Sequence, residues 1–124
     1  MIPELTVSDI ERTKKFYTEI LGFGIAYERP EDKFAFLSLE ENQMMFEQEN
    51  GNWNVGRLEY PYGRGINFEM TVTNVEILYK RVLDAGIRPF REMKVSRYRS
   101  GGEDIVQKEF PIQDPDGYLL RFTD

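Results

Sequence analysis

The sequence predicts an α+β fold in which two tandem β-α-β-β-β modules form a curved mixed sheet around a cleft, with the helices on the outer face. The segment IPELTVSDIERTKKFYTEILG at residues 2–22 recurs, shifted by 65 positions, as NFEMTVTNVEILYKRVLDAG from residue 67 onward. Each copy is followed by short segments of strand character that are separated by polar turns. With 124 residues the chain fits a single domain, with module one at 1–49, a connector at 50–65 and module two at 66–124.

Each copy of the repeat predicts a strand that leads directly into a helix. Apolar and polar residues alternate at the start of each copy, which is the two-residue period of a half-buried strand. Ser8-x-x-Glu11, repeated as Thr73-x-x-Glu76, then predicts a capping box, in which a hydroxyl and a carboxylate satisfy free amides of the first helical turn. Apolar residues at helical spacing follow in both copies.

Three further strands complete the predicted first module. They lie at 25–29, 34–39 and 44–48, and polar turns at 30–32 and 40–43 separate them. The segment NGNWNVGRLEYPYGRG that follows is rich in glycine and contains three aromatic residues. We interpret it as the connector between the modules.

The second module is predicted to repeat this order. A strand is expected at 88–95, a flexible loop at 96–104, and a closing hairpin with strands at 106–113 and 118–123. The hairpin turn is Asp114-Pro115-Asp116-Gly117, with proline and glycine where a tight turn needs a fixed and a permissive backbone. We expect its two aspartates to serve as turn residues without a part in chemistry.

The composition excludes several classes of function. The chain has no histidine and no cysteine, and its formal net charge is −6. The lack of cysteine excludes a disulfide framework and a thiolate metal site, and it fits the reducing cytoplasm. The acidic charge argues against nucleic acid as a partner, and no apolar run is long enough for a membrane span. A cationic small molecule suits this charge, although an acidic surface also serves solubility alone.

Three motifs make the chain similar to the vicinal oxygen chelate superfamily, which includes glyoxalase I, extradiol dioxygenases and bleomycin resistance proteins. They are PELTVSDIERTKKFYTEILGF, INFEMTVTNVEILYKRVLDAGI and KEFPIQDPDGYLLRF, so the resemblance covers essentially the whole chain. The enzymes of this superfamily bind a divalent metal through the first and last strands of each module. The resemblance implies that Ile2, Phe46, Asn67 and Arg121 occupy those positions here. Because an obligate cation at residue 121 repels a metal, we expect a metal-free protein with no cofactor and no catalytic residue.

The resemblance is strongest to the bleomycin-resistance-like branch, whose acidic dimers sequester a cationic drug in clefts lined by aromatic residues. We therefore expect a homodimer that binds a small aromatic, cationic compound. The expected ligand-binding residues are Glu4, Phe34, Phe36, Phe46, Trp53, Asn67, Glu69, Tyr98 and Arg121. We also expect Arg121 to contact Glu4 or Glu69.

Two alternatives remain open at this point. The aromatic residues can instead pack in the core or in a dimer interface, and the charged residues can form an internal ion-pair network. The alternative function is a glyoxalase-like or dioxygenase-like lyase, isomerase or oxygenase with an atypical site.

Overall fold

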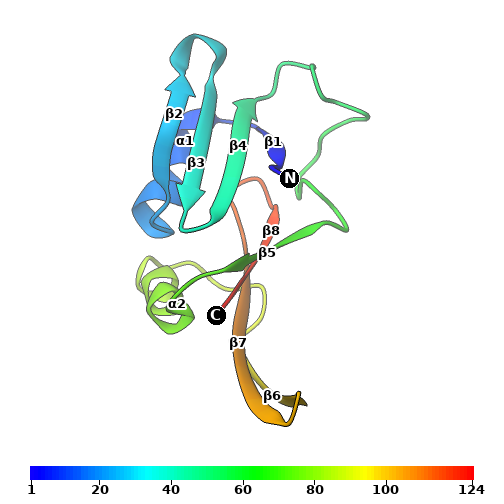
Figure 1. Ribbon diagram of the computed structural model, residues 1–124. Coiled ribbons are helices and arrows are strands. Elements are labelled where there is room, and N and C mark those ends of the chain that lie inside the picture. The colour runs from blue at the N-terminus through cyan, green and yellow to red at the C-terminus, as the bar shows by residue number, and fades with distance from the viewer.

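The computed structural model describes all 124 residues, Met1–Asp124, and folds them into two four-stranded sheets (Figure 1). Module one consists of β1 (Glu4–Val7), α1 (Ile10–Lys15), the π-helical turn η1 (Phe16–Ile20), β2 (Gly24–Arg29), the 3-10 turn η2 (Pro30–Asp32), β3 (Phe34–Leu39) and β4 (Asn42–Gln48). Module two consists of β5 (Asn67–Thr71), α2 (Val75–Asp84), β6 (Lys94–Ser100), β7 (Glu103–Gln113) and β8 (Leu119–Thr123). The predicted α+β class and the tandem order of the two modules are confirmed. No helix in the chain combines the length and the apolar character that crossing a membrane requires.

The two modules have the same sheet topology. Sheet A has the order β1-β4-β3-β2, sheet B has the order β5-β8-β7-β6, and no strand of one sheet pairs with a strand of the other. The first strand pairs in parallel with the last strand of its own module, so that Glu4 lies opposite Met45 and Glu69 lies opposite Arg121. Since Glu4 and Glu69 are equivalent in the repeat, Met45 is the counterpart of Arg121. The assignment of Phe46 to that position was therefore wrong by one residue.

The helices begin one residue later than the predicted capping boxes. The carboxylate of Asp9 accepts hydrogen bonds from the backbone amides of Glu11 and Arg12, and the side chain of Asn74 caps α2 in the same way. The predicted caps, Ser8 and Thr73, were wrong because their hydroxyls bind carboxylates of the opposite module instead.

The prediction for residues 88–104 was also wrong. The strand expected at 88–95 begins only at Lys94, and the expected loop at 96–104 forms most of β6, the turn and the start of β7, with Gly101 and Gly102 at the hairpin tip in left-handed conformations. Nearly all residues of this part of β6 are exposed. A strand with water on both faces has no apolar alternation, so the sequence pattern did not reveal it.

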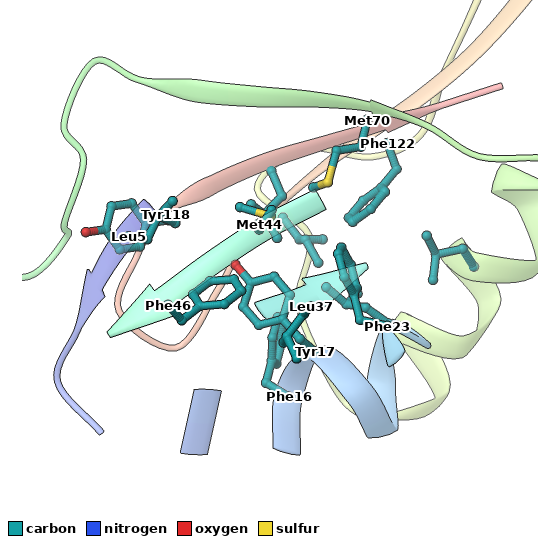
Figure 2. Close-up of a cluster of buried hydrophobic side chains, with 14 of the residues drawn as sticks. Leu5, Phe16, Tyr17, Phe23, Leu37, Met44, Phe46, Met70, Tyr118 and Phe122 are labelled. Atoms are coloured by element: carbon teal, nitrogen blue, oxygen red, sulfur yellow. The ribbon is translucent and has the colours of Figure 1, made fainter. Parts of the chain in front are cut away.

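The helix-facing sides of both sheets share one hydrophobic core. It contains residues of both modules, and Figure 2 shows Leu37 and Met44 of sheet A close to Met70 and Phe122 of sheet B. We call the opposite side of each sheet its open face. Because the two sheets bury their helix-facing sides together, their open faces do not enclose a cleft within the single chain. Every residue of β2 is exposed.

Two pairs of equivalent contacts hold the modules together. The hydroxyl of Tyr118 donates to the carbonyl of Thr6 over 2.8 Å, and the amide of Asn42 donates to the equivalent carbonyl of Thr71 over 2.9 Å. The second pair joins Ser8 to Asp116 and Thr73 to Glu40. In each module, the residue before the helix cap thus donates hydrogen bonds to a carboxylate of the other module.

Candidate functional site

An aromatic cluster lies on the open face of sheet A. Cross-strand pairing places Tyr27 beside Phe36, and their rings stack at 5.1 Å with an interplanar angle of 22°. Phe34 lies next to them, and the guanidinium carbon of Arg29 is 4.0 Å from its ring centroid. Phe34 is only 3% exposed, whereas Tyr27 is 49% exposed. Tyr27 therefore offers a flat, accessible ring above a packed aromatic base.

Two carboxylates share this open face. The strand register places Glu47 opposite Phe34 and beside Thr6, and it places Glu4 opposite Met45. The pKa of Glu4 is raised, chiefly by partial burial and further by the negative charge of Glu47, while Arg29 acts in the opposite direction. A cation on this face would relieve the repulsion between the two acids.

Arg121 is the centre of a polar cluster on the open face of sheet B. Its Nε donates to Oδ1 of Asn67 over 2.7 Å, and its Nη1 lies 3.2 Å from both carboxylate oxygens of Glu109. The expected contact with Glu69 is present at 3.9 Å, and no ion pair joins Arg121 to Glu4. Three side chains therefore hold the guanidinium, and two of them carry a negative charge.

The remaining candidates lie in different environments. Phe46 is fully buried and packs 4.5 Å from Tyr17, so its predicted place in a ligand cleft was wrong. Its partner in the β3–β4 register is Ala35, whose side chain faces the core, and this explains why Phe46 points away from Phe34. Trp53 and Tyr98 are 64% and 49% exposed, on the connector and on β6.

Tyr27, Glu47 and Glu109 belong to these clusters but were not among the predicted site residues. Glu109 lies on β7, two residues before the partner of Arg121, and therefore on the same face. Glu47 follows from the same alternation as Phe34, once the register of β3 against β4 is known. The strand registers therefore identify Glu109 and Glu47, whereas a bulge in β2 interrupts the alternation that would have identified Tyr27.

A pocket of about 320 Å³ opens where the two modules meet. Its apolar lining comes from Met1, Pro3, Met44, Phe68 and Met70. Its polar lining comes from the acids Glu41 and Glu69 and from the amides Asn42, Gln43 and Asn67. No lysine or arginine lines it.

The family model of the Glyoxalase/Bleomycin resistance protein/Dioxygenase superfamily matches residues 3–122. The chain belongs to this superfamily. A lactoylglutathione lyase of Haemophilus influenzae is 30% identical over 125 residues, which cover 97% of this chain and 87% of that protein. A probable chloroplastic lactoylglutathione lyase of Arabidopsis thaliana is 34% identical over 95% of this chain, but the match spans only 33% of the plant protein.

Among solved structures, TioX from Micromonospora sp. ML1 has the same fold. Its TM-score is 0.73 at 19% identity, and the match covers 99% of this chain and 95% of TioX. At this identity the likeness concerns the fold alone.

The residues at the metal-ligand positions of the superfamily do not fit a divalent metal. With the register corrected, these positions hold Ile2, Met45, Asn67 and Arg121. Two of these side chains offer no oxygen or nitrogen ligand, and the carbonyl oxygen of Asn67 already accepts a hydrogen bond from the guanidinium. The carboxylates of Glu69 and Glu109 lie against the same cation. No group of three histidine, cysteine or acidic residues in the chain is arranged to hold a metal.

The aspartates of the closing turn have a larger structural part than a simple turn requires. Asp114 is 4% exposed and accepts hydrogen bonds from the hydroxyl of Tyr17 over 2.8 Å and from two backbone amides. Burial raises its pKa to about 6, although these hydrogen bonds act against the shift. Asp116, equally buried, accepts from Ser8 and from the guanidinium of Arg12. Both acids therefore join module two to module one.

Proposed function

We propose that this protein binds and sequesters a small aromatic, cationic compound without a metal and without changing it chemically. The observation that carries this proposal is the open face of sheet A. There an exposed ring, Tyr27, stacks on Phe36, and the acids Glu4 and Glu47 lie on the same face farther across the sheet, on β1 and β4. An extended aromatic cation can stack on Tyr27 while its charge reaches across the sheet toward the carboxylates.

The proposal includes a homodimer in which a second copy covers the open faces. In the single chain these faces leave large apolar side chains in water, among them Tyr27 on sheet A and Tyr98 on sheet B, each about half exposed. Exposed apolar surface of this kind marks interaction sites. In such a dimer Arg121 and its acidic neighbours would complete the polar lining of the ligand site.

The test is a calorimetric titration with planar aromatic cations, of which proflavine and bleomycin are the first two, followed by mass spectrometry of the recovered compound. We expect saturable binding and an unchanged ligand. Tyr27→Ala and the double variant Glu4→Gln/Glu47→Gln should each weaken binding about tenfold or more. Phe90→Ala is the matched control, because Phe90 is 50% exposed on the other module and should leave binding unchanged. Absence of binding across the panel would contradict the proposal.

The names of the relatives favour a second candidate, an isomerase or lyase that acts on a glutathione adduct. Three curated relatives at 30% to 34% identity are named lactoylglutathione lyases. An assay for S-lactoylglutathione formation tests this candidate directly. Turnover that requires one tightly bound metal per chain, found by elemental analysis and lost in Asn67→Ala, would replace sequestration by catalysis.

A further inference from the structure

The pocket between the modules lies on the side of Asn42, where the two copies of the repeat differ. Asn42 and Tyr118 are equivalent, since each lies three residues before the counterparts Met45 and Arg121 and donates to the equivalent carbonyl of the other module. On the Tyr118 side the space is filled. A Cβ added at Gly63 would lie 2.6 Å from the ring of Tyr118, and the ring of Tyr62 packs edge-on at 5.9 Å. On the other side the shorter Asn42 reaches its carbonyl without filling the space, and the pocket remains.

Some polar side chains of this pocket have hydrogen-bond partners and others have none. The amide of Asn42 is held by two carbonyls, and Asn67 accepts from Arg121. By contrast, the side chains of Glu41 and Gln43 have no hydrogen-bond partner, and Glu69 has only the 3.9 Å contact with Arg121. The pocket thus combines one carboxylate without a partner, Glu41, and a second, Glu69, that has only a long contact with Arg121, with an apolar lining to which the N-terminal residue Met1 also belongs.

We propose that this pocket binds a small primary ammonium ion that is carried on a compact apolar group. The ammonium forms charge-assisted hydrogen bonds with Glu41 and Glu69, which are stronger than bonds between neutral groups. The apolar group lies on Met44, Phe68 and Met70. The volume is within the range of small-molecule sites, and the negative charges of Glu41 and Glu69 disfavour carboxylates and phosphates. This site shares Glu69 with the polar lining of the proposed function but uses none of the aromatic residues on sheet A, so variants of Tyr27 distinguish the two proposals.

The test uses cyclohexylmethylamine, with cyclohexylmethanol as its neutral isostere, in an NMR titration of the full chain. The amine lacks an aromatic ring, so it has no stacking partner on Tyr27. We expect saturable shifts of the backbone amides of residues 41–44 and 67–70, and binding of the alcohol that is weaker by about tenfold. Equal affinity for the alcohol, or shifts confined to other residues, would overturn the proposal.

Two variants test the location. Asn42→Tyr copies the filled side of the repeat, keeps a donor for the Thr71 carbonyl, and should abolish binding of the amine. Glu41→Gln should weaken binding about fivefold to tenfold, and it keeps the proposal testable if Asn42→Tyr does not fold. Glu31→Gln removes the same charge from the exposed turn η2 and serves as the matched control. Unchanged affinity in Glu41→Gln, or in folded Asn42→Tyr, would contradict the assignment.

Tyr27→Ala separates the two sites. It should weaken binding of the aromatic cation and leave binding of cyclohexylmethylamine unchanged. Loss of both activities in Tyr27→Ala would show that the amine binds on sheet A, which would overturn the pocket assignment.

Discussion

Arg121 joins three side chains on the open face of sheet B, and its environment sets the expected effect of its removal. Arg121→Ala leaves Glu69 and Glu109 without a counter-charge. Because the arginine side chain is 33% exposed and water reaches the cluster, we expect a loss of about 1 kcal/mol in the free energy of unfolding, measured by urea denaturation. Arg99→Ala is the matched control, since the Arg99–Asp104 pair is 74% and 81% exposed and should contribute nothing measurable. Equal losses in the two variants would contradict a structural part for the cluster.

Asp114 should make stability depend on pH in a direction unusual for a carboxylate. Its pKa is raised from 3.8 to about 6, so the folded protein holds this proton more tightly than the unfolded chain does. The stability contributed by this proton is therefore absent above about pH 7 and grows as the pH falls through 6 toward 4. Between pH 7.5 and pH 5 wild type should gain about 1 kcal/mol that Asp114→Asn lacks.

The measurement is urea denaturation of both proteins at the two pH values. The other acidic groups titrate in both proteins, so their contribution cancels in the difference between them. Parallel pH profiles for wild type and Asp114→Asn would contradict the raised pKa.

The elements show where sequence patterns determine local structure and where they do not. The strand–helix units of both repeats were predictable, because the buried side of each strand and helix imposes a regular apolar spacing. The helix caps were not predictable from the sequence, since Ser8 and Asp9 are both good capping residues. Only the distant carboxylate of Asp116 decides which of them binds the helix. Most of β6 was missed because water on both of its faces removes the apolar alternation, although the paired glycines that follow it are a turn signal.

The corrected cap leads to a prediction for the first helix. Asp9→Ala removes the acceptor for the amides of Glu11 and Arg12 and should lower the free energy of unfolding by about 1 kcal/mol. Asp9→Asn keeps an oxygen acceptor and should stay within about 0.5 kcal/mol of wild type. Thermal or urea denaturation of both variants measures these losses of unfolding free energy. An equal loss in Asp9→Asn and Asp9→Ala would show that the charge of Asp9, and not its capping hydrogen bonds, stabilises the helix.

At the scale of the whole molecule, the expected cleft depended on a contact that a single sequence does not contain. Alternation correctly separated Phe34 and Phe36 from Ala35 and Leu37, but it could not show that the two sheets bury their helix-facing sides together. The partners of Arg121 were predictable in part, because Glu69 follows from strand-face counting. Glu109 required the register of the closing hairpin.

The uncovered open faces predict association of two chains. Sedimentation should give about twice the chain mass of 14.6 kDa at micromolar concentration. Tyr98→Glu places a charge on an exposed apolar residue of the open face of sheet B and should shift the protein toward monomer. Ile77→Glu makes a similar change on the exposed side of α2 and should leave the mass unchanged. A wild-type monomer under these conditions would contradict the homodimer.

The paired contacts between the modules also bear on how such a chain could arise. In two identical, separate copies of one module, the contact from the closing turn to the residue before the helix cap would form twice, related by a twofold axis. Joining the copies into one polypeptide frees each contact to change by itself. The receiving ends are still alike, with Ser8 and Thr73, whereas the supplying ends have diverged to Asp116 and Glu40. Asn42 and Tyr118 have diverged in the same way. The pocket therefore lies on the Asn42 side of the twofold axis and has no counterpart on the Tyr118 side.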